Sequence, residues 1–175
     1  MIEYLPNPSP YFVANKSFCE HIVKELEESN IAYSGSCTSY GYDVFFSVFS
    51  NGMEYKINYH RHQSTGNMAT TRTRHYALLE ILNIPIDEKI QVNRNTWLSA
   101  FLWKANRIKL STHFTLTSTS NLTQDNKTFL LDKFDYLKLI TLKLNHKKLE
   151  ASFWNDKLLP TELVHEFNEI LKILA

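Results

Sequence analysis

Apolar side chains recur every three or four positions near both ends of the chain. Near the N-terminus, Phe18, Ile22 and Leu26 lie four residues apart, which places them on one face of a helix over residues 17–29. Near the C-terminus, apolar residues with the same spacing follow Pro160, a residue type that suits the first turn of a helix. They are Leu163, Phe167, Ile170, Leu171 and Leu174. The pattern therefore predicts a helix near each end of the chain, each with one buried face.

The first helix is predicted to begin at Ser17, because Ser17 and Glu20 have the spacing of a capping box. Upstream of it, prolines recur at positions 6, 8 and 10, and proline removes a backbone donor that a helix interior needs. Residues 1–16 are therefore predicted to form an extended, proline-rich arm ahead of a single domain over residues 17–175.

Strict alternation of apolar and other residues is clearest on either side of Asn51-Gly52, the dipeptide preferred in two-residue hairpin turns. A two-residue turn here places Asp43 opposite His60. In that register the apolar residues of the two strands share one face. They are Val44, Phe46 and Val48 on the first strand and Tyr55, Ile57 and Tyr59 on the second. The pattern predicts a β-hairpin over residues 43–60 with this face in the core.

The remaining segments have weaker patterns, and residues 128–144 match neither period well. The predicted elements are a strand and loop over 31–42, a polar loop over 60–74, a short helix over 74–82, a helix over 95–106, a strand over 107–118, two strands over 128–144 and a turn over 145–148. Together they predict an α+β fold with a mainly antiparallel β-sheet packed by three to four helices, in the order α-β-β-β-α-α-β-β-β-α.

Composition narrows the class of protein. A hydrophobic content of 43% and an aromatic content of 13% are enough for a packed core. Two cysteines without a C-x-x-C spacing predict neither a disulfide framework nor a zinc knuckle, so a reduced, cytoplasmic location is expected. No segment approaches the roughly 20 apolar residues of a membrane span. Four dispersed glycines also exclude the glycine-rich phosphate loops.

Charge is unevenly distributed, although the whole chain carries only +1. Residues 1–54 have two basic and seven acidic residues, whereas residues 55–124 have nine basic and three acidic ones, including all five arginines. Aromatic residues interleave with these bases, and arginine with aromatic rings is typical of surfaces that bind a polyanion. The candidate residues for such binding are Lys56, Tyr59, Arg61, Arg72, Arg74, Arg94 and Arg107. A charged stretch of sequence need not form one surface, so a solvated exterior is the alternative.

The second candidate is a metal-binding site. His60 and His62 are two residues apart on a predicted strand, so both imidazoles point to the same face, and Asp43 lies across from them. Two histidines and one carboxylate are a ligand set that zinc accepts, with a position left for water. The alternative is an Asp–His hydrogen bond that only stabilises the hairpin.

The segment 17–62 also resembles the α-β-β core of the PD-(D/E)xK nucleases. Asp43 lies in one predicted strand and Glu54-Tyr55-Lys56 in the next, after a helix that contains Glu20. In that family the acidic pair holds a divalent metal and the lysine helps to activate water. The predicted hairpin register separates Asp43 and Glu54 by about 20 Å along the strands, too far to share a metal. The resemblance therefore implies at most a degenerate core, and we assign no catalytic residue from it.

These observations predict a small intracellular domain that is not an enzyme and acts by binding another protein, as an adaptor, inhibitor, immunity-type or chaperone-like protein. No cofactor is expected, with a divalent metal as the exception if the histidine site forms. The first alternative is a nucleic-acid-binding or degenerate phosphodiester-processing domain that uses residues 55–124. The second is a His/Asp metal-dependent enzyme. A membrane partner is not expected, and the sequence leaves a homo-oligomer open.

Overall fold

The structure is a computed structural model, and it describes residues 1–5, 10–62, 75–86, 89–94, 108–109, 114–118, 123–154 and 159–174. Within these ranges the chain forms three helices and ten strands. The helices are α1 (Pro10–Glu28), α2 (Gln124–Tyr136) and α3 (Pro160–Leu174). The strands are β1 (Ile2–Tyr4), β2 (Tyr33–Cys37), β3 (Gly41–Ser50), β4 (Met53–His62), β5 (Tyr76–Leu82), β6 (Ile90–Arg94), β7 (Ile108–Lys109), β8 (Phe114–Ser118), β9 (Leu139–Asn145) and β10 (Lys148–Trp154).

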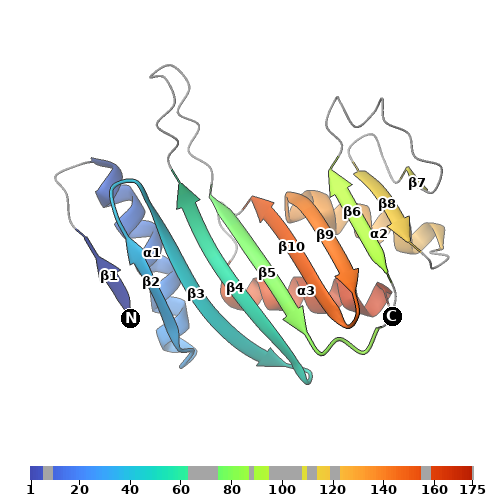
Figure 1. The fold of residues 1–175 in the computed structure, drawn as a ribbon, viewed down its shortest axis with the longest axis horizontal. Helices are drawn as coiled ribbons and strands as arrows, with labels where there is room; N and C mark the ends of the chain where they lie inside the picture. The colour runs from blue at the N-terminus through green and yellow to red at the C-terminus, as the bar shows by residue number, and fades with distance from the viewer. Residues whose placement is uncertain are drawn as a thin grey trace, which may run out of the picture.

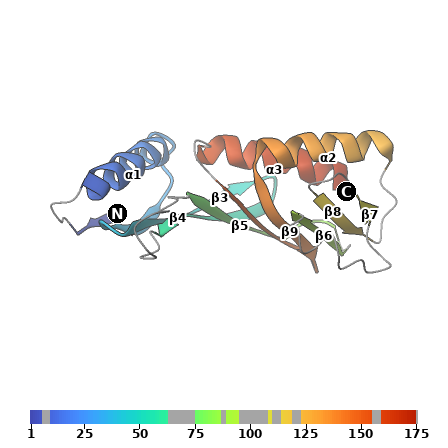
Figure 2. The same cartoon turned by 90° about the horizontal axis from the view of Figure 1, so that it is seen from above.

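All ten strands join one sheet in the order β1-β2-β3-β4-β5-β10-β9-β6-β8-β7 (Figure 1). Every neighbouring pair is antiparallel except β1 and β2, which are parallel. The three helices lie on the same face of the sheet, with α1 over the N-terminal strands and α2 and α3 over the other half (Figure 2). The predicted α+β fold with a mainly antiparallel sheet is confirmed. None of the described helices combines the length and apolar character needed to cross a membrane.

The β3–β4 hairpin has the predicted register. Asp43 pairs with His60, and Val44 pairs with Tyr59. Asn51 and Gly52 form the turn with φ values of 52° and 76°, the left-handed conformation that this dipeptide tolerates. The face that holds Val44 and Tyr59 is buried beneath the helices, so the predicted core face is also confirmed.

The N-terminal arm differs from the prediction. Helix α1 begins at Pro10, because proline suits the first helical position, so Ser17 lies inside the helix and does not cap it. Within the described part of the predicted arm, residues 2–4 are extended and form strand β1 beside β2. Ile2 is buried there opposite Gly35, so this segment packs as an edge strand of the sheet.

The helix predicted over residues 74–82 is wrong, because this segment forms the central strand β5. It pairs with β4 on one side and β10 on the other. Its buried residues Ala77, Leu79 and Ile81 alternate with more exposed ones. Pairing on both edges outweighs the helical preference of a leucine-rich segment.

Two further predictions change in the C-terminal half. Residues 128–144 do not form two strands: helix α2 comes first, capped by the Thr123 side chain, which accepts from the Asn126 backbone N–H, and β9 follows. Leu130 and Phe134 are buried four residues apart, which is helical spacing. The single strand predicted over 107–118 is also wrong, because the described residues of this range form two strands, in which Ile108 of β7 pairs antiparallel with Leu116 of β8.

The turn predicted over residues 145–148 is confirmed, since it joins β9 and β10 with His146 and Lys147 at positive φ. The C-terminal helix is confirmed as α3, with all five predicted apolar residues buried. The helix predicted over 95–106 and most of the loop predicted over 60–74 lie outside the described residues. His60, Arg61 and His62 at the start of that loop belong to β4.

Candidate functional site: the open face of the sheet

The face of the sheet opposite the helices carries side chains from alternate positions of each strand. Cross-strand pairing aligns them in rows that run across the sheet. One row consists of Ser34, Phe45, Asn58, Leu78, Ser152 and Thr141. The next row consists of Ser47, Lys56, Glu80, Glu150 and Lys143. We call this surface the open face, because within the described part of the chain no helix covers it (Figure 2).

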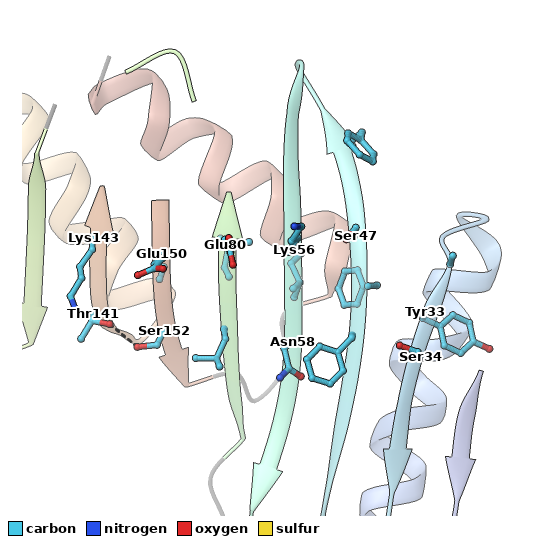
Figure 3. Close-up of a pocket in the computed structure, with 18 residues that line it drawn as sticks. Tyr33, Ser34, Ser47, Lys56, Asn58, Glu80, Thr141, Lys143, Glu150 and Ser152 are labelled. Carbon is cyan, nitrogen blue, oxygen red and sulfur yellow. Dashed lines mark hydrogen bonds between the residues drawn. The ribbon is translucent and has the colours of Figure 1, made fainter. Parts of the chain in front are cut away.

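The open face is hollowed over its centre. A cavity of about 1080 Å³ is lined by residues of β2, β3, β4, β5, β10 and β9 (Figure 3). Small residues such as Ser47 and Ser152 line it beside the larger side chains of Phe45 and Lys143. Six strands about 4.8 Å apart make the hollow roughly 24 Å wide. That width exceeds a typical small-molecule pocket and is comparable with a macromolecular contact.

Three large apolar side chains are exposed on the lining of this hollow. Phe45 is 48% exposed, Phe49 is 76% exposed and Leu78 is 45% exposed. Phe45 and Leu78 flank Asn58 from the two neighbouring strands, and Phe49 lies four residues farther along β3. A scattered exposed apolar residue is ordinary, but a cluster on one concave surface is typical of an interaction site.

Between Phe45 and Leu78, the amide of Asn58 has an unmet hydrogen-bonding capacity. Its Oδ1 atom is buried and accepts no hydrogen bond from any described residue. A buried amide oxygen without a donor is unfavourable. Asn58 is therefore a polar residue in the lining of the hollow whose side-chain oxygen has no described donor.

Charged residues on the open face neutralise one another. The Lys148 ammonium lies 3.0 Å from Glu80 and 2.9 Å from Glu150, and hydrogen bonds to these carboxylates raise the pKa of Lys148. Lys56 lies 3.8 Å from Glu54 on the same strand. The Thr141 and Ser152 hydroxyls hydrogen-bond each other at 2.8 Å (Figure 3). Among the described residues, the open face therefore carries mixed charges without an excess of positive charge that would attract a polyanion.

The candidate polyanion-binding residues that the structure describes do not lie on one surface. Tyr59 and Arg61 lie in the interior, and Lys56 lies on the open face beside Glu54. The Arg94 guanidinium lies over the Trp154 ring, 4.8 Å from its centroid. Arg72, Arg74 and Arg107 lie outside the described residues. Polyanion binding by these candidates stays a prediction.

The predicted metal site is assembled in part. Asp43 lies opposite His60 in the ladder, while the His60 ring stacks on Tyr76 with centroids 5.3 Å apart. His62 continues β4 opposite Gly41, but its side chain is outside the described part. Among the side chains that are described, no three histidine, cysteine, aspartate or glutamate residues are grouped closely enough to hold a metal ion. The metal hypothesis therefore depends on His62 and stays a prediction.

Sequence reasoning did not select Phe45, Phe49 or Leu78 as functional residues. The available signal was the apolar run from Val44 to Phe49, which makes β3 apolar on both faces. A strand with only one face in the core has apolar residues at alternate positions. The apolar residues on the second face of β3 therefore indicated that this face also packs against another element or a partner.

None of the protein-family models, curated proteins or solved structures compared with this chain matches it. Function is therefore inferred from the chemistry and geometry of the open face.

Proposed function

We propose that this protein is a binding domain that acts through another protein, and that an amphipathic helix of this partner lies in the hollow of the open face. The exposed cluster of Phe45, Phe49 and Leu78 carries the proposal. Burial of this cluster against a partner would remove apolar surface from water, at roughly 25 cal/mol for each Å². The role is one of recognition, as in an adaptor, inhibitor or chaperone-like protein.

A helix suits this surface better than an extended segment. Extended peptides bind sheet edges, where backbone groups are unpaired, whereas the two faces of a sheet are covered by side-chain packing. Here α1, α2 and α3 cover one face, and a partner helix would supply the missing layer on the other. A helix about 10 Å in diameter fits within a hollow roughly 24 Å wide.

Charge balance supports a protein partner over nucleic acid. Lys56 of the open face lies beside Glu54, and Lys148 lies between Glu80 and Glu150. A polyanion would have to displace these carboxylates, whereas an apolar helix face with amide or hydroxyl groups would not. Asn58 adds specificity, because its buried oxygen favours a partner side chain that donates an N–H.

The test is a selection with a display library of 18-residue helical peptides on the wild-type protein. Selected peptides should carry apolar residues at positions i, i+3, i+4 and i+7 and bind with micromolar affinity. The triple variant F45S/F49S/L78S should bind them at least tenfold more weakly. Val13→Ser is the matched control, because Val13 is an exposed apolar residue on α1.

Any of four outcomes would contradict the proposal. Selected peptides could bind the triple variant as tightly as the wild type, or they could lack a helical apolar stripe. Salt-dependent binding of a generic oligonucleotide that the triple substitution leaves unchanged would favour the nucleic-acid alternative. Concentration-dependent dimerisation lost in the triple variant would assign the open face to a second copy of the chain.

A further inference from the structure

A buried arginine lies beneath α1, on the side of the sheet opposite the open face. Arg61, near the end of β4, is only 6% exposed. Its Nη1 group donates a hydrogen bond of 2.5 Å to Oδ1 of Asn15 on α1. Asn15 is itself fully buried, and its Nδ2 donates to the Thr38 carbonyl at 2.8 Å. The amide of Asn15 thus holds one corner of the guanidinium in a defined orientation.

No described carboxylate compensates the charge of Arg61. The ion pairs found among the described residues all use lysines. Burial lowers the pKa of Arg61, and no aspartate or glutamate raises it again. A buried charge is normally paired, because the loss of hydration is otherwise uncompensated. Arg61 departs from this rule.

One donor of the guanidinium has no acceptor among the described residues. Nη1 is occupied by Asn15, but Nε is buried and donates to no described residue. The Nε and Nη2 groups form the planar edge with which arginine binds an oxyanion through two parallel hydrogen bonds. Arg61 therefore carries a buried Nε donor that no described acceptor uses, on the edge suited to an oxyanion.

The start of α1 increases the local positive potential. The helix begins at Pro10 and has no acidic residue in its first turn, so no side chain of that turn offsets the positive end of the helix dipole. Tyr11, in this first turn, is close enough to Arg61 to affect its pKa. Asn15, the hydrogen-bond partner of Arg61, lies in the second turn. A buried cation and a helix N-terminus are thus adjacent.

The surrounding side chains are rigid and aromatic. Tyr42 lies directly opposite Arg61 in the β3–β4 ladder, and its hydroxyl is 2.5 Å from Nδ1 of His75. The Phe18 ring stacks on Tyr42 with centroids 5.0 Å apart and packs at a tilt against His75 with centroids 4.7 Å apart. This packing restricts the space around the guanidinium, which favours a compact ligand.

We propose that Arg61 and the first turn of α1 form a binding site for a small oxyanion, of the size of phosphate, sulfate or a carboxylate. The oxyanion accepts from Nε and Nη2 of Arg61 and lies in the field of the helix N-terminus. It neutralises a charge that the described residues leave uncompensated. The site is separate from the open face and does not depend on a protein partner.

The test is an anion series on the full chain at constant ionic strength, with chloride as the reference. Inorganic phosphate, sulfate and acetate are titrated, and the melting temperature and the heat of binding are measured. We expect a saturable stabilisation by at least one of these anions with a dissociation constant in the millimolar range. Comparison of the dissociation constants for phosphate and sulfate with that for acetate distinguishes a tetrahedral oxyanion from a planar carboxylate as the preferred ligand. Absence of any saturable effect beyond that of chloride would overturn the proposal.

Variants assign the effect to Arg61. Arg61→Met removes the charge at similar length and should abolish the stabilisation, while Arg61→Lys keeps the charge without the planar edge and should weaken binding at least tenfold. Arg94→Met is the matched control, because Arg94 lies far from α1 against Trp154, and it should respond as the wild type does. Stabilisation of the Arg61 variants by these anions to the same extent as the wild type would contradict the proposal.

A spectroscopic measurement on the wild type is independent of whether these variants fold. The ¹⁵N resonance of the Arg61 Nε group should shift progressively as phosphate is added and reach a plateau. A purely structural arginine that only ties β4 to Asn15 would not shift. The triple variant F45S/F49S/L78S should retain the effect, so the failure of one proposal can be distinguished from the failure of the other.

Discussion

Asp43 lies directly opposite His60 across the β3–β4 ladder, while Glu54 lies opposite Phe49 near the turn. The two carboxylates are therefore about six residues, or roughly 20 Å, apart along the hairpin. A nuclease-type metal site requires the aspartate, the glutamate and the lysine to converge on one point. The register of this hairpin keeps Asp43 away from Glu54 and Lys56, so the resemblance to the PD-(D/E)xK core does not extend to a catalytic centre.

Gly35 is expected to be intolerant of a side chain. A Cβ atom at this position would lie 1.9 Å from the backbone oxygen of Asp43 and 3.1 Å from Cδ1 of Ile2. Because the closer atom belongs to the backbone, β2 would have to shift against β3. We expect Gly35→Ala to lower the free energy of unfolding by about 2–3 kcal/mol. Urea denaturation measures this loss.

Gly52→Ala provides the comparison for Gly35→Ala. A Cβ atom at Gly52 meets nothing within 4 Å, but the residue has a φ of 76° in the hairpin turn. The cost there is backbone strain of about 1 kcal/mol. A loss for Gly35→Ala no larger than that for Gly52→Ala would contradict the close approach of β2 and β3.

Asn168 of α3 joins the helix to the end of the β3–β4 hairpin. Its Oδ1 atom accepts from the Tyr55 hydroxyl at 2.6 Å and from Nδ2 of Asn51 at 3.3 Å. Asn168→Ala removes the acceptor of a buried hydroxyl and should cost about 1–3 kcal/mol. In a double-mutant cycle with Tyr55→Phe, the two losses should be non-additive by about 1 kcal/mol. Additive losses would show that the hydrogen bond between Tyr55 and Asn168 does not contribute to the free energy of unfolding.

Two glutamates on α3 form ion pairs of equal length with different burial. Glu166 lies 2.6 Å from Lys133 of α2 with its side chain 11% exposed, and Glu169 lies 2.6 Å from Lys172 with the lysine 69% exposed. Glu166→Ala leaves Lys133 partly buried without its partner and should cost about 2–3 kcal/mol. Glu169→Ala should cost much less, because solvent screens the exposed pair. In thermal denaturation, Glu166→Ala should therefore have a clearly lower melting temperature than Glu169→Ala. Equal melting temperatures would contradict the larger contribution of the Glu166–Lys133 pair.

Stability should fall at alkaline pH. Cys19 and Cys37 are fully buried, and burial raises the pKa of both thiols above the usual value of 9.0. The same effect raises the pKa of Tyr55 to about 12. In the unfolded chain these groups lose their protons at lower pH than in the folded protein. The contribution of these groups to the free energy of unfolding is therefore fully present below pH 9. It falls as pH rises, by up to about 1.4 kcal/mol per pH unit for each group.

Cys19→Ala tests the alkaline prediction. The variant should be less stable at pH 7, because it leaves space in the core, but its free energy of unfolding should fall less steeply between pH 9 and 10.5 than that of the wild type. Urea titrations at pH 7, 9 and 10.5 give the slopes. Equal slopes for the variant and the wild type would exclude Cys19 as a source of the pH dependence. In addition, neither native thiol should react with a thiol reagent until the protein unfolds.

The sequence by itself determined the elements whose signals are local. The β3–β4 hairpin follows from Asn51-Gly52 and from the alternation on either side, because turn type and register are properties of neighbouring residues. Helix α3 follows from its apolar spacing, and the β9–β10 turn from a short polar segment. These predictions needed no knowledge of what packs against them.

Only the tertiary structure decided the rest. Residues 76–82 are a strand because β4 and β10 pair with both edges, and no local pattern states which strands will be neighbours. The same is true of the sites. Phe45 is exposed because all the described helices lie on the other face of a strand that is apolar on both, and Arg61 is buried because α1 covers it. Burial depends on contacts between distant segments, so a side chain's environment, and with it its chemistry, is set only when the whole chain folds.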